Sequence, residues 1–446
     1  MSIPGIGIDY QQVIKGLVLL LILAAFAESI ANQLEQNVIR QPGASRRKVG
    51  RTFRRQRCLK SRNESARSDL IRTSGALGWS VMNWSPQQDE ALTAVAQWLK
   101  RGDTRLYRLF GYAGTGKTTL ARHIAEGVDG DVLFAAFTGK AAAVLRDKGC
   151  EGASTIHSLI YRSRGAEDEE ETPSFVLNRQ SELTKADLIV IDECSMVDEE
   201  LGRDLLSFKV PVLVLGDPAQ LPPVRGGGFF TEAEPDMMLT EVHRQARDNP
   251  IIRMSMQVRE GGELMLGGDE QARVITKRDI DADQVMKADQ VLVGLNRTRR
   301  LYNGRIRALS GFRDPMPAAG EKLVCLRNNK TKGLFNGSTW TVKALRGEAK
   351  GMVKMELMPD DETGKRGVDV AVLTDFFTGA EEDIPFSARR DSDEFTYGYA
   401  LTVHKSQGSQ WDDVVLFDES RAFREHRARW LYTGITRAAE RLTVVV

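Results

Sequence analysis

Short apolar runs bounded by Gly, Asp or Thr recur along the chain from residue 84 onward. The runs at 132–137, 188–191 and 212–215 are wholly apolar, and the segment 106–110 has apolar residues at both ends. Apolar runs of this length are typical of strands that are buried on both faces, as in a parallel sheet. Helix-forming stretches separate the runs, and strands that alternate with helices predict an α/β fold.

A helix is predicted to begin just after Ser85. Serine is a favoured N-cap, Pro86 suits the first helical position, and acidic residues follow in the first turn. Apolar residues then recur at helical spacing at Ala91, Leu92, Val95, Trp98 and Leu99. On this helix Gln88 is a candidate for binding adenine, because a glutamine amide can donate and accept hydrogen bonds at once.

The second half of the chain contains a different pattern. Residues 321–326, 338–344 and 352–357 are rich in β-forming residues, and Gly and Asn turns such as Asn336-Gly337 separate them. Such segments are typical of short strands joined by tight turns. A further apolar run at 414–417 lies near the C-terminus.

The first 81 residues differ in composition from the rest. An uncharged apolar run of twelve residues at 16–27 is shorter than the about twenty that a membrane-spanning helix needs. Residues 40–72 hold twelve lysines and arginines against two acids, which predicts a disordered segment. Either translation begins near Met82 and this leader is not part of the working protein, or the leader is a genuine arm that attracts DNA or a membrane.

The charge balance excludes a protein that binds nucleic acid through a global basic field, because the net charge is +1 with 28% charged residues. DNA would have to bind in a local groove. Cys58, Cys150, Cys194 and Cys325 are widely spaced and form no CxxC pair. This spacing is typical of reduced thiols and argues against a structural metal, so a cytoplasmic protein is expected.

The segment 111–119, Gly-Tyr-Ala-Gly-Thr-Gly-Lys-Thr-Thr, follows a predicted strand and opens a predicted helix. This is the context of a phosphate-binding loop, whose backbone N–H groups and helix N-terminus cradle a polyphosphate. Lys117 is expected at the β- and γ-phosphates and Thr118 at Mg²⁺. Besides Gln88, the residues expected to contact ATP are Gly114, Thr115, Gly116, Lys117, Thr118 and Thr119. The chain is therefore predicted to hydrolyse ATP with Mg²⁺.

Polar residues stand at the ends of two further predicted strands. Asp192 and Glu193 follow the run at 188–191, and Gln220 follows the run at 212–215. Ligands of open parallel sheets bind at the carboxyl ends of the strands, so these side chains are expected beside the phosphate loop. Asp192 would complete the Mg²⁺ shell, Glu193 would orient and deprotonate the attacking water, and Gln220 would sense the γ-phosphate.

Several further motifs follow one another in a fixed order. They are Thr138-Gly139-Lys140, Ser154-Thr155-Ile156-His157, Asp192-Glu193-Cys194-Ser195-Met196, the segment 216–224, Glu241-Val242-His243-Arg244-Gln245, the segment 402–408 and Thr436-Arg437. With Gln88 and the phosphate loop, this series resembles superfamily 1 helicases of the 5′-to-3′ branch, the RecD-like and Dda-like group. The resemblance covers residues 82–446. Phe137 stands where the family usually has proline, and Cys194 stands where alanine is common.

The resemblance implies two RecA-like P-loop NTPase domains with parallel sheets, at 82–240 and 241–446, that sandwich ATP. It also implies a small hairpin insertion at 158–186 and an SH3-like β-barrel insertion at about 312–392. Arg244 and Arg437 are implied to reach from the second domain toward the γ-phosphate, where they would stabilise transition-state charge.

Residues that grip single-stranded DNA are implied as well, namely Thr138, Lys140, His157, Thr402, His404 and Lys405. Such contacts go to phosphates and sugars and do not read the sequence of bases. Phe175, in the hairpin insertion, is implied to be an aromatic pin that splits the duplex. The alternative is that Phe175 only anchors its own loop.

The implied function is an ATP-dependent DNA helicase that moves 5′ to 3′ on single-stranded DNA and unwinds duplex. A single-strand translocase that unwinds poorly and a motor subunit of a recombination complex are the alternatives. A metabolic P-loop kinase fits poorly, because it would not need a second RecA-like half. Expected partners are single-stranded and forked DNA, with single-strand-binding or recombination proteins as further candidates. The protein is expected to be monomeric, without membrane association unless the leader is genuine.

Overall fold

A six-stranded parallel sheet forms the centre of the first half of the chain, in the order β3-β2-β6-β7-β1-β8. Its strands are β1 (Leu106–Gly111), β2 (Val132–Ala136), β3 (Ser154–Thr155), β6 (Leu188–Asp192), β7 (Val212–Gly216) and β8 (Met237–Leu239). The four strands predicted from apolar runs are all present. Leu188 and Val190 point into one hydrophobic cluster, and Ile189 and Ile191 into another, so the sheet is covered on both faces.

The computed structural model describes residues 84–163, 175–223, 228–242, 248–329, 331–360, 366–379, 381 and 384–446. The predicted leader (residues 1–81) and Arg244 lie outside these ranges. The described residues belong to one unit, Asn83–Val446. Within these ranges no helix combines the length and the apolar character that a membrane crossing requires.

Helices pack on both faces of the first sheet. One hydrophobic cluster includes residues of α4 (Pro86–Arg101), α5 (Lys117–Gly127) and α6 (Gly139–Asp147), and the other includes residues of α7 (Ile156–Ile160) and α8 (Glu199–Leu206). Two short 3₁₀ helices, η1 (Glu182–Lys185) and η2 (Cys194–Met196), flank β6. The helix α4 begins as predicted, with Ser85 as its N-cap and Pro86 at its first position.

A two-stranded antiparallel sheet occupies part of the span where the hairpin insertion is predicted. It pairs β4 (Tyr161–Ser163) with β5 (Phe175–Leu177), and Ser163 lies opposite Phe175 in the register. The residues between these strands, 164–174, and the side chain of Phe175 lie outside the described part of the chain. The role of Phe175 as a pin therefore stays a prediction.

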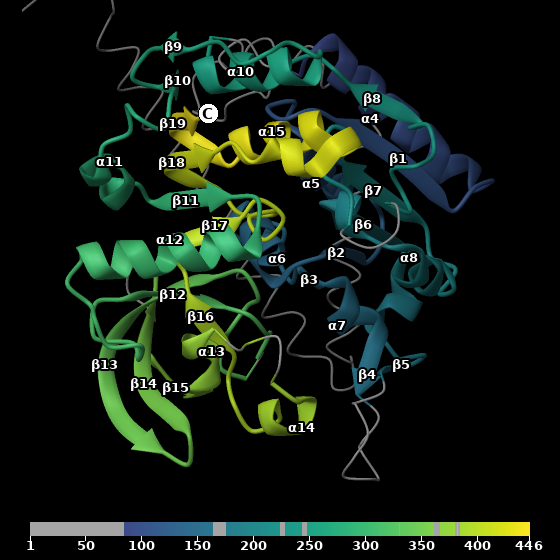
Figure 1. Ribbon diagram of the computed structural model, residues 1–446. Helices are drawn as coiled ribbons and strands as arrows, with labels where there is room; N and C mark the ends of the chain where they lie inside the picture. The colour runs from purple at the N-terminus through teal and green to yellow at the C-terminus, as the bar shows by residue number, and fades with distance from the viewer. Residues whose placement is uncertain are drawn as a thin grey trace, which may run out of the picture. The chain divides into compact units, whose positions relative to one another are not determined.

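The second half of the chain contains another six-stranded sheet, in the order β17-β11-β18-β19-β10-β9, in which only β9 is antiparallel. Its strands are β9 (Gly267–Gly268), β10 (Ala272–Ile275), β11 (Gln290–Val293), β17 (Ala400–Thr402), β18 (Trp411–Phe417) and β19 (Ala438–Val445). The accompanying helices are α10 (Pro250–Arg259), α11 (Ala282–Lys287), α12 (Asn296–Leu309), η3 (Ser420–His426) and α15 (Arg427–Ile435). Figure 1 shows α15, in yellow, running between this sheet and the first one.

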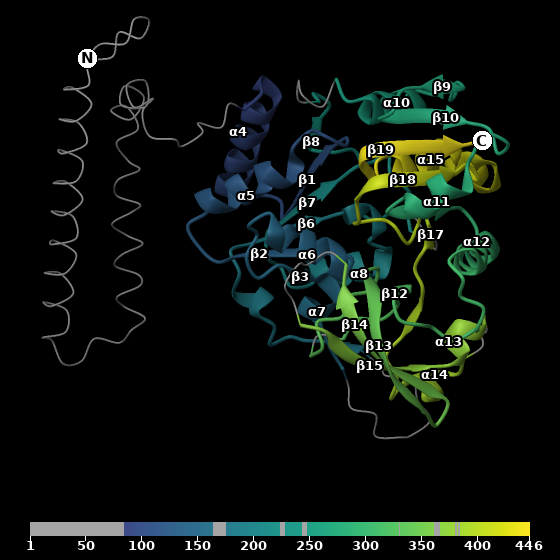
Figure 2. The same cartoon turned by 90° about the vertical axis from the view of Figure 1, so that its left-hand side faces the viewer.

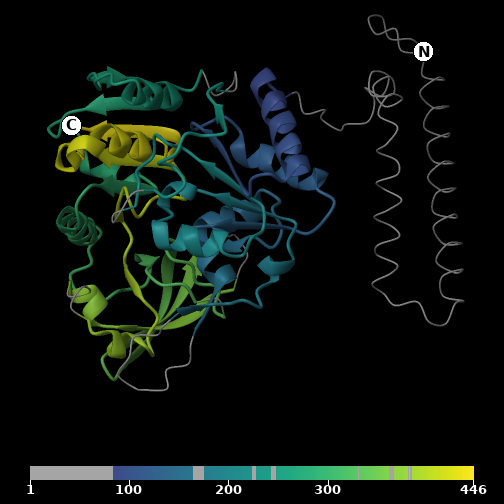
Figure 3. The same ribbon diagram turned by 90° about the vertical axis from the view of Figure 1, so that its right-hand side faces the viewer.

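Five antiparallel strands form a third sheet within the span predicted to hold the β-barrel insertion, in the order β15-β14-β13-β12-β16. They are β12 (Lys322–Cys325), β13 (Thr339–Ala349), β14 (Met352–Pro359), β15 (Val368–Leu373) and β16 (Phe395–Tyr397), with the short helices α13 (Asp375–Thr378) and α14 (Phe386–Arg389). This sheet has its own hydrophobic cluster, which includes Trp340 and Phe395. Figures 2 and 3 show it from opposite sides, at one end of the two parallel sheets. Its likeness to an SH3 barrel stays a prediction.

Candidate functional site

The segment between β1 and α5 has the backbone of a phosphate-binding loop. Gly114 and Gly116 adopt φ values of +79° and +78°, a left-handed conformation that favours glycine. Gly116 is the N-cap of α5 and has no side chain to cap it, so the first N–H groups of the helix remain available to an anion. The local geometry fits a polyphosphate.

Lys117 folds back over this loop. Its Nζ donates to the carbonyl oxygens of Gly111 at 2.6 Å and Tyr112 at 3.0 Å. The lysine therefore keeps its ammonium group within the loop, where it can exchange a carbonyl partner for a phosphate oxygen.

Thr118 and Asp192, the two side chains predicted to bind magnesium, lie within hydrogen-bonding distance of each other. The Thr118 hydroxyl donates to Asp192 Oδ2 at 3.0 Å, and the other carboxylate oxygen of Asp192 accepts from the backbone N–H of Glu193 at 2.8 Å. Hydroxyl and carboxylate oxygens are suitable ligands for Mg²⁺. These two side chains would hold the ion next to the phosphates.

Glu193 has an unusual backbone, with φ of +53° in a residue other than glycine. Such strained residues cluster at functional sites. Burial raises the pKa of its carboxyl group and Asp192 raises it further, while the charges of Arg437 and Lys117 oppose the rise. A carboxylate with a raised pKa is suited to accept a proton from water.

Arg437 approaches this carboxylate from the second half of the chain. Its guanidinium is 6% exposed and donates to the carbonyl oxygens of Thr433 at 3.0 Å and Ser409 at 3.2 Å, and to the Thr436 hydroxyl at 3.1 Å. These hydrogen bonds fix the orientation of the guanidinium group. Its position between the two halves agrees with the expected role at the γ-phosphate, which stays a prediction.

Tyr432 is a site residue that the sequence reasoning missed. Its hydroxyl accepts from the backbone N–H of Ala113 in the phosphate loop at 2.9 Å, and it donates to Asp217 Oδ2 at 2.6 Å. Tyr432 and Asp217 are 1% and 2% exposed. Burial raises the pKa of Asp217, whereas Lys117 and the tyrosine hydroxyl lower it. No local sequence pattern distinguishes this tyrosine from a core residue of α15.

Arg259 is a second contact that the sequence did not predict. Its guanidinium lies 3.7 Å from the centre of the Tyr112 ring in the phosphate loop. Arg259 ends α10, so a cation–π contact joins the second half of the chain to the loop.

Gln88 is buried and its amide is engaged within the protein. Its Oε1 accepts from the backbone N–H of Ser85 at 3.0 Å, which completes a capping box, and its Nε2 donates to the carbonyl oxygen of Thr115 at 3.0 Å. The side chain therefore connects α4 to the phosphate loop. The spacing Ser-x-x-Gln is the sequence signal for this capping role.

The loop after β7 is held by the second half of the chain. The backbone N–H of Leu221 donates to the Thr433 hydroxyl at 2.9 Å, and the carbonyl oxygen of Leu221 accepts from Gln407 Nε2 at 2.9 Å. Next to it, Gln220 is 7% exposed, and its Oε1 has no hydrogen-bond partner among the described residues. This buried acceptor is consistent with the predicted role of Gln220 near a nucleotide.

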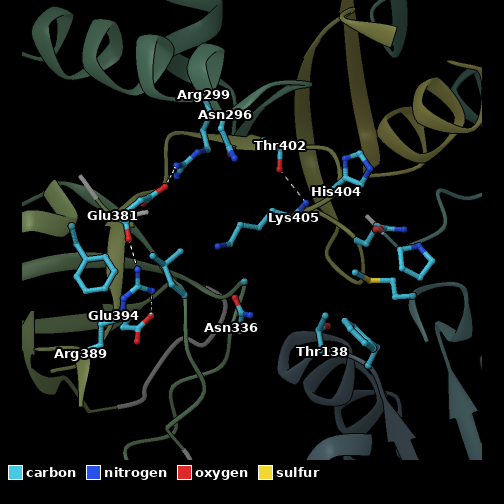
Figure 4. Close-up of a pocket in the computed structure, with 17 residues that line it drawn as sticks. Thr138, Asn296, Arg299, Asn336, Glu381, Arg389, Glu394, Thr402, His404 and Lys405 are labelled. Carbon is cyan, nitrogen blue, oxygen red and sulfur yellow. Dashed lines mark hydrogen bonds and ion pairs between the residues drawn. The ribbon is translucent and has the colours of Figure 1, made fainter. Parts of the chain in front are cut away.

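A cavity of about 540 Å³ lies next to this loop, lined by residues of both halves of the chain. Four of the predicted DNA contacts line it, namely Thr138, Thr402, His404 and Lys405. Pro223, Gln407 and Phe137 line it as well. Figure 4 shows Lys405 extending into the cavity, with Arg299 and Asn296 on one side and Thr138 across from them.

Basic and acidic side chains both line the cavity, namely Arg299, Arg389 and Lys405 and the carboxylates of Glu381 and Glu394. Burial, together with the nearby charge of Arg299, lowers the pKa of Lys405 to about 8. Arg299 forms an ion pair with Glu381. Burial also lowers the pKa of His404, whose ring lies 5.3 Å from that of Phe423. Arg299 is thus already paired and the lowered pKa leaves His404 neutral at pH 7, so Lys405 is the side chain of this group that fits a backbone phosphate.

The remaining predicted DNA contacts lie outside this lining. The exposed His157 ring packs 5.8 Å from the rings of both Phe137 and Tyr161, and Lys140 lies half-buried in the first turn of α6. His157 thus packs against Phe137, which itself lines the cavity. The departure of Phe137 from the family pattern therefore falls on the wall of the cavity.

Two glycines allow the halves to meet at the edge of the cavity. Gly408 has φ of +76°, and a Cβ there would lie 2.9 Å from Ala141 Cβ and 3.0 Å from the Thr138 hydroxyl. At Gly139, a Cβ would lie 2.8 Å from the side chain of Phe335, in the turn between β12 and β13. Both contacts join the N-terminus of α6 to the second half of the chain.

The chain matches two families of known proteins. Residues 83–279 match the AAA domain family, and residues 397–445 match the UvrD-like helicase C-terminal domain family. The first match covers the first sheet and extends through β10 of the second, the second match covers β17, β18 and β19, and most of the antiparallel sheet lies between the two matches.

Similar proteins are named as DNA helicases. The ATP-dependent RecD2 DNA helicase of Deinococcus radiodurans is 30% identical over 356 residues, which are 76% of this chain and 46% of that protein. The chain thus spans about half the length of this relative. The ATP-dependent DNA helicase Pif1 of Bdellovibrio bacteriovorus is 26% identical over 383 residues, 74% of this chain and 81% of that protein.

A solved structure shares the fold. It is reported as the structural basis for DNA unwinding at forked dsDNA by two coordinating Pif1 helicases, and it aligns with a TM-score of 0.51 at 19% identity, over 81% of this chain and 92% of its own. This likeness shows the fold alone.

Proposed function

Because this chain belongs to the superfamily 1 helicases of the RecD-like and Dda-like group, we propose that it is an ATP-dependent DNA helicase. It moves 5′ to 3′ along single-stranded DNA and unwinds the duplex ahead. Mg²⁺ and ATP bind at the phosphate loop, and single-stranded DNA binds in the 540 Å³ cavity. The two α/β halves are proposed to be its two RecA-like domains.

The main support for this proposal is that the loop 217–223 connects the two candidate sites. Asp217, at one end, contacts Tyr432 beside the phosphate loop, and Pro223, at the other end, lines the cavity. The same short loop therefore touches both candidate sites. A change in nucleotide state that moves α15 would move the loop, and so would alter the wall of the DNA cavity.

The chemistry at the nucleotide is assigned to the side chains that converge there. Thr118 and Asp192 would hold the magnesium ion, and Glu193 would accept a proton from the attacking water. Lys117 and Arg437 would stabilise the negative charge that develops on the phosphate oxygens. When bound, the ion supplies charge neutralisation at the phosphates.

The test is strand displacement by the full chain with ATP and Mg²⁺, on duplexes that carry a single-stranded tail at the 5′ or the 3′ end. We expect displacement from the 5′-tailed duplex only. Glu193→Gln is the matched control, because it keeps the size of the side chain and removes the base.

Other outcomes decide between the alternatives. ATPase activity that single-stranded DNA stimulates, without displacement of either strand, would favour the translocase or a motor subunit that needs its complex. Displacement from the 3′-tailed duplex would contradict the proposed polarity. Absence of ATPase activity with and without DNA would overturn the proposal.

A further inference from the structure

A hydrogen-bonded chain of three groups ties the phosphate loop to the second half of the protein. The Ala113 N–H donates to the Tyr432 hydroxyl at 2.9 Å, and that hydroxyl donates to Asp217 at 2.6 Å. Both side chains are almost wholly buried. The three groups belong to the phosphate loop, to α15 and to the loop that follows β7.

Ala113 belongs to the loop whose backbone N–H groups are the expected ligands of phosphate oxygens. An N–H group has a single hydrogen and makes one strong hydrogen bond at a time. The tyrosine hydroxyl and a phosphate oxygen must therefore compete for it. Lys117 is in a similar state, since its ammonium group donates to carbonyl oxygens of the loop itself.

We propose that Tyr432 is a latch on the phosphate loop and that a bound nucleotide releases it. The Tyr432 hydroxyl accepts the Ala113 N–H, which a phosphate oxygen would also accept. A phosphate oxygen carries negative charge and is the stronger acceptor, so it displaces the hydroxyl from this N–H. This inference rests on the proposed function only in that the loop binds a nucleotide.

Release of the latch has a path to the rest of the site. Tyr432 is followed directly by Thr433, which holds Leu221, and Arg437 donates to the carbonyl oxygen of Thr433. Loss of the Ala113 bond therefore frees α15 from the loop, while the bond between Tyr432 and Asp217 can persist. Tyr432 acts as a positioning residue, because it sets where α15 sits relative to the nucleotide.

The contact of Arg259 with Tyr112 makes the latch testable. This cation–π contact is a second tie between the halves, at the residue next to Ala113. It remains when Tyr432 is replaced by phenylalanine, which also keeps the buried ring. Tyr432→Phe therefore removes the competing hydroxyl, and with it the hydrogen bond to Asp217, while the ring and the Arg259 contact stay.

The experiment measures binding of ADP by calorimetry, with Mg²⁺ and without DNA, to the full chain and to its Tyr432→Phe variant. We expect the variant to bind about threefold to tenfold more tightly, as loss of one competing hydrogen bond would give. We also expect a lower DNA-stimulated kcat, because α15 no longer responds to the loop. The matched control is Tyr397→Phe, which removes another buried hydroxyl, one that donates to the carbonyl oxygen of Pro315 at 2.6 Å.

A Tyr432→Phe variant that has the wild-type melting temperature and binds ADP no more tightly than the wild type would overturn the latch. An equal gain in ADP affinity in Tyr397→Phe would overturn it as well. Hydrogen–deuterium exchange of the wild type tests it independently of any variant. The Ala113 amide should be protected without nucleotide, and fast exchange there would also overturn the latch. Tighter ADP binding by Tyr432→Phe in a protein that unwinds no DNA would support the latch and contradict the helicase.

Discussion

Replacing Arg437 with alanine is expected to stop ATP turnover while nucleotide still binds. An arginine that stabilises transition-state charge in phosphoryl transfer contributes about 10³–10⁵ in rate. We therefore expect the DNA-stimulated kcat to fall by about 10³-fold at least, equivalent to about 4 kcal/mol of activation free energy. The assay is phosphate release at saturating ATP and single-stranded DNA, with ADP binding measured alongside.

The same substitution also affects folding stability, and the two effects must be separated. Arg437 is 6% exposed and makes three hydrogen bonds within its own half of the chain. At about 0.5–1.5 kcal/mol for each of the three bonds, the free energy of unfolding should fall by about 1.5–4.5 kcal/mol. Arg437→Lys is the control, because it keeps the charge but cannot reproduce the fork of donors.

A pH profile distinguishes a role in catalysis from a role in packing. The charge of Arg437 lowers the pKa of Glu193, which burial raises. Glu193 can accept a proton only when ionised, so activity is present above its pKa and is lost as the pH falls through it. Removing Arg437 raises this pKa, so the acid limb of the residual activity should move to higher pH in Arg437→Ala and much less in Arg437→Lys. A wild-type rate with an unmoved acid limb in the alanine variant would refute the reasoning.

Four further predictions each concern the substitution of one residue. Lys117→Ala should abolish ATP turnover in a phosphate-release assay, and normal turnover would contradict the site assignment. Phe175→Ala should reduce unwinding while DNA-stimulated ATPase persists; unchanged unwinding would leave Phe175 as a loop anchor. Lys405, with its pKa lowered to about 8, is charged below that pH and neutral above it, so single-stranded DNA should bind more weakly at pH 9 than at pH 7; Lys405→Arg should flatten this dependence, and a flat wild-type profile would contradict it. Gly408→Ala should weaken DNA binding by about tenfold in a fluorescence-anisotropy titration, because the new methyl group would lie 2.9 Å from Ala141 Cβ and φ is +76°; wild-type affinity would show that the edge of the cavity tolerates it.

The sequence was sufficient for the features that depend on short stretches of chain. The phosphate loop and the acid pair Asp192-Glu193 each follow a buried strand directly, so a local pattern of apolar residues places them at the same edge of the sheet. The hydrogen bond between Thr118 and Asp192 confirms that they meet. The segments with turns at Gly and Asn likewise predicted strands that the third sheet contains.

Features that depend on contact between the halves could not be derived in this way. Tyr432 is an apolar-face residue of its helix, and only the approach of Ala113 and Asp217, more than two hundred residues away, gives its hydroxyl a role. Likewise, no sequence motif indicates that Arg259 contacts the phosphate loop. Gln88 is a different case. The motif Ser85-x-x-Gln88 is a sequence signal for its capping box, whereas no sequence motif signals its hydrogen bond to Thr115.

The two hydrogen bonds that hold Leu221 imply that the two halves of the chain move relative to each other in discrete steps. Both main-chain hydrogen-bonding groups of this buried residue are satisfied from the other half of the chain, by Thr433 and by Gln407. A small separation would leave an N–H and a carbonyl oxygen unpaired in an apolar environment, at about 1–3 kcal/mol each. Intermediate separations of the two halves are therefore poorly populated. The proposed movement along DNA should then occur in steps of fixed size, even where the ATP concentration changes smoothly.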